Sequence, residues 1–359
     1  MSELCCRFDV SRKTGYKWLG RFRAEGEGGL VDRSRRPWRS AYRTPREVEE
    51  LVCGVREAHP VWGGRKIRGF LLRQGHEGVP AASTITQILR RRGLITEPSK
   101  RRGFERFERP EPNELWQMDF KGWFPLGDGR RVHPLGVLDD HSRYNLCLAA
   151  CPNQRTATVQ GLLQATFGHY GLPQAMLMDN GSPWGNARGQ PWTPLTVWMV
   201  DLGIEVIHSA PFHPQTAGKE ERFHHTLGLE VIDTQPTWDS YPQVQVAFDQ
   251  FRALYNHHRP HESLGETIAP VDRYQPSPRP YPDSINPPAY PDHWPTRKVD
   301  INAGISFGGT RYKIGRAFKR CTVGLAPQPN GTWTIHYRHH PIRTINPNNT
   351  TVTHVPEHP

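Results

Sequence analysis

The fold of this chain is decided by the run ELWQMDF at residues 114–120, which predicts a strand that carries one carboxylate, Asp119. Two further strand-like runs, RVHPLGVL at 131–138 and YNLCLAA at 144–150, are joined by the turn residues DDHSR, a hairpin pattern. Downstream, helices and strands are expected in alternation: helix 156–170, strand 174–179, helix 193–202, strand 205–209 and a helix from Lys219. Residues 113–275 therefore read as one α/β core.

Three antiparallel strands followed by alternating helices and strands form a ribonuclease-H-like order. In it Asp119 lies mid-strand, Asp179 ends a neighbouring strand, and Glu221 starts a helix aimed at the sheet. Three converging carboxylates repel one another, and two divalent cations relieve that repulsion and create a phosphoryl-transfer centre. Hard oxygen ligands favour Mg²⁺, with Mn²⁺ as a substitute. Asp139 and Asp140 are interpreted as turn or capping residues.

Composition narrows the class of protein. The 359 residues include 46 Lys+Arg and 35 Asp+Glu, a formal charge of +11 that favours a polyanionic partner. No apolar run is long enough to cross a bilayer, and the start lacks a secretory signal, so a cytoplasmic protein without a membrane partner is expected. The six cysteines form no CxxC pair, which favours buried thiols over zinc or disulfides.

The first 45 residues predict a helix-turn-helix module. Ser11 is a suitable N-cap for a basic helix, and four of its side chains are expected to contact DNA: Arg12, Lys13, Lys17 and Arg21. A plain helical hairpin with solvated charges is the alternative. Only three residues precede Leu4, where a three-helix unit needs a helix, so a truncated module is a further expectation.

Residues 46–95 predict a second helix-turn-helix module. Its last helix begins near Ser83 and Thr84 and ends in the run Arg90, Arg91 and Arg92, and these five residues are expected to contact DNA phosphates. The following segment, 96–112, is a basic linker that suits a phosphate backbone without reading sequence.

The last part of the chain separates into two segments. Residues 276–295 hold a proline at almost every second or third position, which predicts an extended, semi-rigid linker. Residues 296–359 alternate apolar and polar positions between Gly turns and predict a small β-barrel. A DNA-contacting barrel and a purely structural or oligomerising one are both open.

Four stretches of the core carry a likeness to a known family. They are WQMDF at 116–120, LDDHSRY at 138–144, MDNG at 178–181 and HPQTAGKEERF at 213–223. In this order they resemble the integrase-core motifs of bacterial insertion-sequence transposases, which belong to the DDE superfamily shared with retroviral integrases. The run YNHHRPHESLG at 255–265 is similar to the segment that follows the core in such transposases.

The resemblance implies Asp119 and Asp179 as the two catalytic, metal-binding aspartates. The family pattern of Gly, two variable residues and Glu falls on Gly218 and Glu221, with Glu220 as the alternative, since adjacent helical positions point about 100° apart. Lys219 and Arg222 are candidate contacts to substrate phosphates. The gap between the second and third carboxylates is longer than usual for the family, and the loop 182–191 is expected to hold the extra length.

The function implied is transposition. The N-terminal modules would bind the inverted-repeat ends of a mobile element, and the core would cleave each 3′ end and join it to target DNA. The partners would be double-stranded DNA and at least one further subunit, with the protein at the nucleoid when DNA-bound. A transposition-dead DNA-binding protein or repressor is the alternative, and a ribonuclease-H-type nuclease is a third.

Overall fold

A computed structural model describes residues 1–33, 44–95, 108–185, 192–209, 218–347 and 352–354. Most of the predicted basic linker and parts of the loops 182–191 and 211–218, including His213, lie outside these ranges. The chain divides into two compact units, Met1–Arg46 and Glu47–Pro359. No helix in the described ranges is both long and apolar enough to span a membrane.

The central sheet contains the five strands predicted from the sequence and one short strand, β2, that was not predicted. Its strands are β1 (Leu115–Phe120), β2 (Phe124–Pro125), β3 (Arg131–Asp139), β4 (Asn145–Cys151), β5 (Ala175–Met178) and β6 (Glu205–His208). Strand β3 pairs antiparallel with β1, β2 and β4, whereas β1, β5 and β6 run parallel. The α/β ribonuclease-H-like fold class is therefore confirmed for the core.

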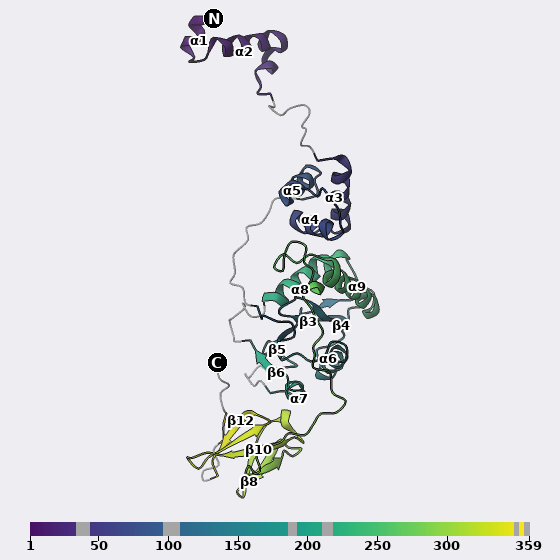
Figure 1. The fold of residues 1–359 in the computed structure, drawn as a ribbon, viewed down its shortest axis with the longest axis vertical. Coiled ribbons are helices and arrows are strands. Elements are labelled where there is room, and N and C mark those ends of the chain that lie inside the picture. Colours follow the sequence, from purple (N-terminus) through teal and green to yellow (C-terminus); the bar gives the residue numbers. More distant parts are fainter. Residues whose placement is uncertain (34–43, 96–107, 186–191, 210–217, 348–351, 355–359) are drawn as a thin grey trace. The chain divides into compact units, whose positions relative to one another are not determined.

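Helices cover both faces of this sheet (Figure 1). On one face, α8 (Gly218–Glu230) and α9 (Tyr241–Ala253) pack through Phe223, Leu227 and Phe248 against the sheet. On the other, α6 (Thr156–Tyr170) and α7 (Pro194–Asp201) bury a second core that includes Trp116 and Phe167. A π-helical turn, Leu254–His258, follows α9.

The sequence motif DDHSR forms the turn between β3 and β4. Asp139 is fully buried, and its carboxylate accepts hydrogen bonds from the backbone N–H groups of Asn113 and Ser142, each at 2.7 Å. The Ser142 hydroxyl donates a third at 2.5 Å. The interpretation of Asp139 as a turn-capping residue is thus confirmed.

The second N-terminal module is a three-helix unit seated on the core. It comprises α3 (Arg46–Ala58), α4 (Gly64–Arg73) and α5 (Ala82–Arg91), packed around buried Trp62. From α4, the Arg73 guanidinium reaches both carboxylate oxygens of Asp272 and the carbonyl oxygens of His257 and Thr267. Helix α4 therefore binds the segment that follows α9.

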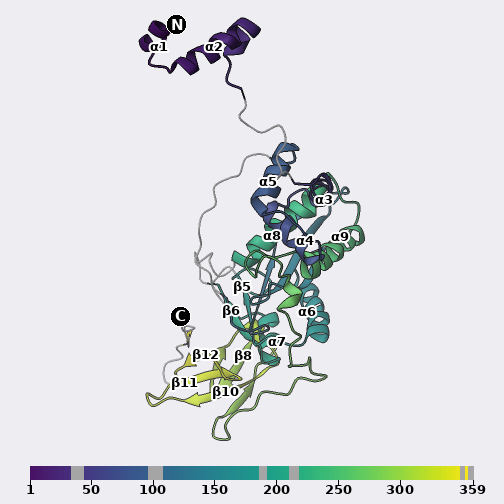
Figure 2. The same cartoon turned by 45° about the horizontal axis from the view of Figure 1, so that its top comes forward.

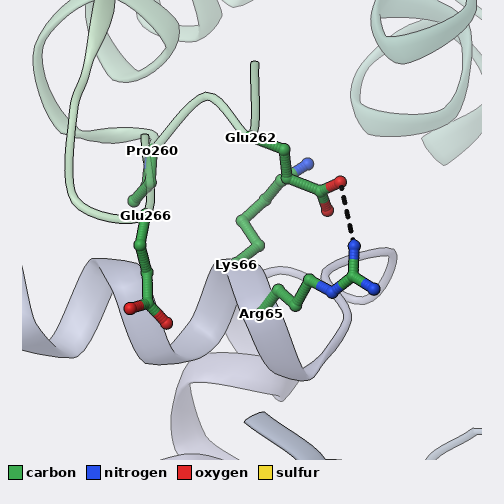
Figure 3. A pocket seen from close by; sticks show the side chains of 5 residues that line it. All are labelled: Arg65, Lys66, Pro260, Glu262 and Glu266. Carbon is green, nitrogen blue, oxygen red and sulfur yellow. Dashed lines mark ion pairs between the residues drawn. The ribbon is translucent and has the colours of Figure 1, made fainter. Parts of the chain in front are cut away.

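A shallow cavity lies beside this contact (Figure 3). It is lined by Arg65 and Lys66 of α4 and by Pro260, Glu262 and Glu266 of the facing segment, and Arg65 forms an ion pair with Glu262 at 3.8 Å. Another ion pair of the contact joins Arg68 to Glu266. Together with the Arg73–Asp272 pair, these ion pairs tie α4 to the core.

A glycine allows α4 to approach the core this closely. A Cβ added at Gly69 would lie 2.0 Å from the carbonyl oxygen of Glu266, whereas one at Gly54 of α3 would meet nothing within 4 Å. We expect Gly69→Ala to destabilise the second unit by about 1–3 kcal/mol through overpacking. Gly54→Ala, the matched control, is expected to stabilise it by up to about 1 kcal/mol, since alanine favours helix. Thermal unfolding of the two variants measures the difference, and equal melting temperatures would contradict it.

The first unit contains α1 (Ser2–Arg7), α2 (Arg12–Glu25) and a 3₁₀ turn, Gly26–Leu30. Ser11 caps α2 as predicted, because its hydroxyl accepts the N–H of Thr14 at 3.1 Å. Cys5 is buried, but most large apolar side chains of the unit are exposed: Leu4, Phe8, Val10, Tyr16, Phe22, Leu30 and Val31.

The proline-rich segment is extended, as predicted, and it is also fastened to the core. The Arg279 guanidinium donates to the carbonyl oxygens of Pro173, Leu202 and Gly203 at 2.6–3.1 Å, and Tyr281 packs against the core under α6. Further along, the Tyr290 hydroxyl donates to the carbonyl oxygen of Thr322 at 2.9 Å. The segment is therefore held against the α/β core by Arg279 and against the C-terminal strands by Tyr290.

The C-terminal region is a small β domain, as expected (Figure 2). Its strands are β7 (Thr296–Lys298), β8 (Gly304–Phe307), β9 (Thr310–Lys313), β10 (Thr322–Pro327), β11 (Trp333–Tyr337), β12 (His340–Ile345) and β13 (Val352–His354). They form a five-stranded sheet, β13-β12-β11-β10-β7, and a β8–β9 hairpin. The pairings among the described strands leave β13 and β7 as edges, so the ladder is open where a closed barrel was expected.

Helix α7 belongs to two hydrophobic cores. Leu195 and Met199 pack into the core under the central sheet, whereas Val197 and Val200 are buried among the C-terminal strands. The Tyr337 hydroxyl and the Arg338 guanidinium also reach Asp201 at the end of α7, at 2.6 and 2.8 Å. The C-terminal sheet is thereby packed against the α/β core.

Candidate active site

Asp119 lies on β1, and Asp179 directly follows the end of the neighbouring strand β5. In the parallel pairing of β1 with β5, Leu115 faces Ala175 and Gln117 faces Leu177, an offset of 60 residues that also separates the two aspartates. Burial, followed by repulsion from Asp179, raises the pKa of Asp119 from its usual 3.8 to about 6. The Asp179 carboxylate is thus close enough to disfavour the charge of Asp119.

Trp184 and Gly181 hold the Asp179 side chain. The indole Nε1 of Trp184 donates to Asp179 Oδ1 at 2.5 Å, and the Gly181 N–H donates to the same oxygen at 2.9 Å. Trp184 is itself buried and stacks on Phe120, with 5.4 Å between the ring centroids. Nothing in the sequence indicates the hydrogen bond between this tryptophan and Asp179.

Asn180 shapes the turn after β5. Its side-chain amide donates to the carbonyl oxygen of Ser209 at 3.0 Å, which ties this turn to the end of β6. The hydrogen bond thus assigns Asn180 to the shape of this turn.

The two glutamates at the start of α8 face different surroundings. Glu220 is 1% exposed, and burial, followed by repulsion from Asp119, raises its pKa well above the usual value. Glu221 is exposed, as the 100° step between adjacent helical residues requires. No group of three His, Cys, Asp or Glu side chains within the described ranges has the geometry of a metal site. The structure thus brings Glu220, the alternative, beside Asp119, and it does not gather the three predicted carboxylates.

His224 lies between Asp119 and Glu220. Its Nδ1 is 3.7 Å from Asp119 Oδ2, and its Nε2 is 3.5 Å from Glu220 Oε2. Burial, followed by repulsion from Lys121, lowers the pKa of His224 to about 4, so the ring is neutral near pH 7. The sequence signal for this pair is the spacing of four residues, which places both side chains on one helical face.

Lys219 forms an internal ion pair. Its ammonium group reaches the Asp140 carboxylate and the Asp140 carbonyl oxygen, the latter at 3.1 Å, and its side chain is only 15% exposed. The same carboxylate accepts the Gln117 side-chain amide and the Arg109 N–H, both at 2.7 Å. The Lys219 ammonium, expected to contact DNA, is therefore held inside the protein by Asp140, whereas Arg222 is exposed on α8.

Two of the three arginines at the end of α5 form internal ion pairs, although all three were expected to contact DNA. Arg91 and Arg92 pair with the buried carboxylate of Glu49, at 2.5 and 3.5 Å, and so hold α5 to α3. Ser83 and Arg90 are exposed and lie two helical turns apart, hence on one face, and Thr84 is half-buried beside them. Gln87, which the sequence analysis missed, is exposed between them.

The basic side chains of α2 lie at the surface of the first unit. Arg12, Lys13 and Lys17 are exposed, and Arg21 is half-buried. The Arg21 guanidinium lies 5.0 Å from the centre of the Trp18 ring, and the Lys17 ammonium lies 5.6 Å from it. Two of the four predicted contact residues of α2, Lys17 and Arg21, thus share one aromatic neighbour.

Comparison with known proteins gives relatives of two kinds. The "Insertion element IS476 uncharacterized 39.2 kDa protein" of Xanthomonas euvesicatoria is 30% identical over 154 residues, 43% of this chain and 42% of that protein. The Pro-Pol polyprotein of simian foamy virus type 3 (strain LK3) is 27% identical over 163 residues, 44% of this chain and 14% of the polyprotein. The matched region thus spans less than half the length of either relative.

Among solved structures, an intasome of simian T-cell lymphotropic virus in complex with PP2A regulatory subunit B56 gamma is similar. The TM-score is 0.39 at 15% identity, over 86% of this chain and 96% of that chain. The fold assignment does not depend on this distant similarity, because the strand order and the domain matches support it directly.

Family models match most of the chain. A homeodomain-like domain matches residues 14–89, integrase core domains match 109–214 and 202–268, and the C-terminal domain of the IS481 family of transposases matches 295–353. These matches confirm the resemblance carried by the motifs. The chain combines a homeodomain-like region, an integrase core and an IS481-family C-terminal domain, which is the domain set of an insertion-sequence transposase.

Proposed function

We propose that this protein binds the inverted-repeat ends of a mobile element, hydrolyses the phosphodiester at each 3′ end and joins the freed 3′-hydroxyl to target DNA. The observation that carries the proposal is the proximity of Asp119 on β1 to Asp179 at the end of the adjacent strand β5, where Asp179 contributes to the raised pKa of Asp119. Two carboxylates that oppose each other's charge suit a divalent cation, because positive charge turns their repulsion into attraction.

We propose Asp119, Asp179 and Glu221 as ligands of two Mg²⁺ ions, which Mn²⁺ can replace. Ligands that share an ion with a DNA phosphate have to be accessible from outside, and Glu221 is exposed whereas Glu220 is not. The family spacing from Gly218 also favours Glu221. When bound, the ions activate the attacking water or hydroxyl and stabilise the leaving oxygen. No covalent enzyme intermediate and no ATP are needed.

The chain's own residues position the substrate. Trp184 and Gly181 keep the Asp179 carboxylate in one orientation, and Arg222 on α8 is proposed to contact the phosphates at the reacting end. Binding of the repeat ends is proposed for exposed and half-buried polar side chains of the N-terminal helices: Arg12, Lys13, Lys17, Arg21, Ser83, Thr84 and Arg90. Joining two ends requires at least two subunits, so we propose a dimer or larger assembly on DNA.

The test uses the full chain with duplex oligonucleotides from the inverted repeats that flank its gene. We expect a nick that leaves a 3′-hydroxyl, and joining of that end to a second duplex, both dependent on Mg²⁺ and abolished by a chelator. Specific binding to the ends with neither reaction would instead support the repressor alternative. Nicking of every duplex without end preference would support a ribonuclease-H-type nuclease.

A further inference from the structure

An enclosed polar pair lies behind Asp119 on the inner face of α8. Glu220 and His224 are 1% and 7% exposed. Being four residues apart, they lie one above the other on the helix. His224 directs Nε2 toward Glu220 and Nδ1 toward Asp119, at 3.5 and 3.7 Å. One imidazole ring thus faces a carboxylate with each of its nitrogens.

These polar atoms are poorly satisfied as they stand. Both Glu220 oxygens and His224 Nε2 are buried and lack a hydrogen bond of normal geometry within the described ranges, although the Leu138 backbone contributes a weaker polar contact to Glu220. A buried polar group left unsatisfied costs about 1–3 kcal/mol. An apolar pair would therefore give a more stable α8, and stability alone does not account for this arrangement.

Strand β3 leaves room for the pair. Gly136 lies directly opposite Asp119 in the β1–β3 pairing. A Cβ at Gly136 would come within 2.9 Å of Glu220 Oε2 and 3.2 Å of His224 Nε2. The absence of a side chain at this position lets both groups approach the sheet beside Asp119.

We propose that Glu220 and His224 are positioning residues for Asp119. Glu220 fixes the His224 ring at Nε2, and the ring presents Nδ1 to Asp119 Oδ2, which holds that carboxylate in the orientation needed for a cation. Carboxylates that bind metals are commonly held by such second partners, and catalytic hydrogen bonds that are long in the unbound state tighten on binding. The inference rests on the proposed function in that Asp119 is taken as a metal ligand.

The test compares Mn²⁺ binding to the purified full chain, followed by electron paramagnetic resonance in the absence of DNA. Glu220→Leu and His224→Leu are each expected to weaken binding by about 10- to 100-fold. Glu220→Gln is expected to stay within about threefold of the unsubstituted chain, because its amide keeps a polar partner at Nε2. His225→Leu, at the exposed neighbour on α8, is the matched control and should leave the affinity unchanged.

Thermal unfolding separates positioning from a structural role. Removing a poorly satisfied buried group should leave the melting temperature of Glu220→Leu unchanged or raise it, while its Mn²⁺ affinity falls. Gly136→Ala perturbs the pair from the strand side without altering any carboxylate and should weaken Mn²⁺ binding in the same direction. If a leucine variant does not fold, Gly136→Ala and Glu220→Gln still carry the test.

Two results would overturn the inference. Unchanged Mn²⁺ affinity in the leucine variants would remove the positioning role. Equal loss in Glu220→Gln and Glu220→Leu would make Glu220 a direct ligand instead. A chain that binds Mn²⁺ but does not process DNA ends would contradict the proposed function, and the Mn²⁺ comparison would still decide the role of the pair.

Discussion

Asp119→Asn and Asp179→Asn are each expected to reduce end cleavage and strand joining by at least about 10²–10³-fold, the scale of losing one group that stabilises charge in the transition state. Asparagine has nearly the same shape as aspartate but no charge, so the attraction for a divalent cation is lost. Binding of the repeat ends should persist, because we assign it to helices of the N-terminal modules. Gel shift measures end binding, and labelled oligonucleotides report cleavage and joining.

The same variants should not lose stability. The pKa of Asp119 is raised by burial and by Asp179, which means that the folded protein disfavours its charge. Neutralising either aspartate removes that repulsion, and the melting temperature should stay constant or rise. Asp128→Asn, on the exposed turn before β3, is the matched control and should keep full activity. Strand transfer retained by either active-site variant would refute the assignment of the two aspartates.

Asp140→Ala is expected to cost about 3–5 kcal/mol of stability, the scale of removing one partner from a buried ion pair. The Asp140 side chain is fully buried and receives donors from three separate segments: Lys219 on α8, Gln117 on β1 and the backbone of Arg109. Alanine would remove the Asp140 carboxylate from beside the enclosed Lys219 ammonium. Chemical unfolding measures the loss of free energy.

A double substitution tests whether the loss comes from the unpaired charge. Asp140→Ala combined with Lys219→Met should be less destabilised than Asp140→Ala alone, since no buried charge remains. Asp128→Ala, which removes the partner of Arg130 in an ion pair about half exposed on both sides, should cost no more than about 1 kcal/mol. Equal losses for the two single alanine variants would show that burial does not strengthen the Asp140 pair.

The sheet and its two aspartates could be predicted because their signals are local. Strand-forming runs and turn residues define β1, β3 and β4, and the strand order then places the ends of β1 and β5 side by side. The places of Asp119 on β1 and of Asp179 after β5 follow from these elements, whereas their catalytic role stays a prediction that the family resemblance implies. The turn role of Asp139 was equally accessible, because DDHSR sits between two strand patterns.

The partners of the charged side chains could not be predicted in the same way. From the sequence, Lys219 and Arg91 were expected to be surface cations. In the fold, Lys219 pairs with Asp140, 79 residues away, and Arg91 pairs with Glu49, 42 residues away. The choice between Glu220 and Glu221 depends on the rotation of α8 about its axis over the sheet. The amino-acid sequence does not determine that rotation. A run of basic residues in the sequence therefore indicates positive charge but does not show which carboxylates pair with it.

The double packing of α7 has a consequence for how this protein could be divided. In a core fragment ending at residue 275, the apolar side chains of Val197 and Val200 would be exposed to water. We expect such a fragment to aggregate. A fragment that holds only the C-terminal domain would lack Val197 and Val200, which are part of its hydrophobic core. We therefore expect the C-terminal domain to be exchangeable between related elements only together with α7, because this helix completes the hydrophobic core of both domains.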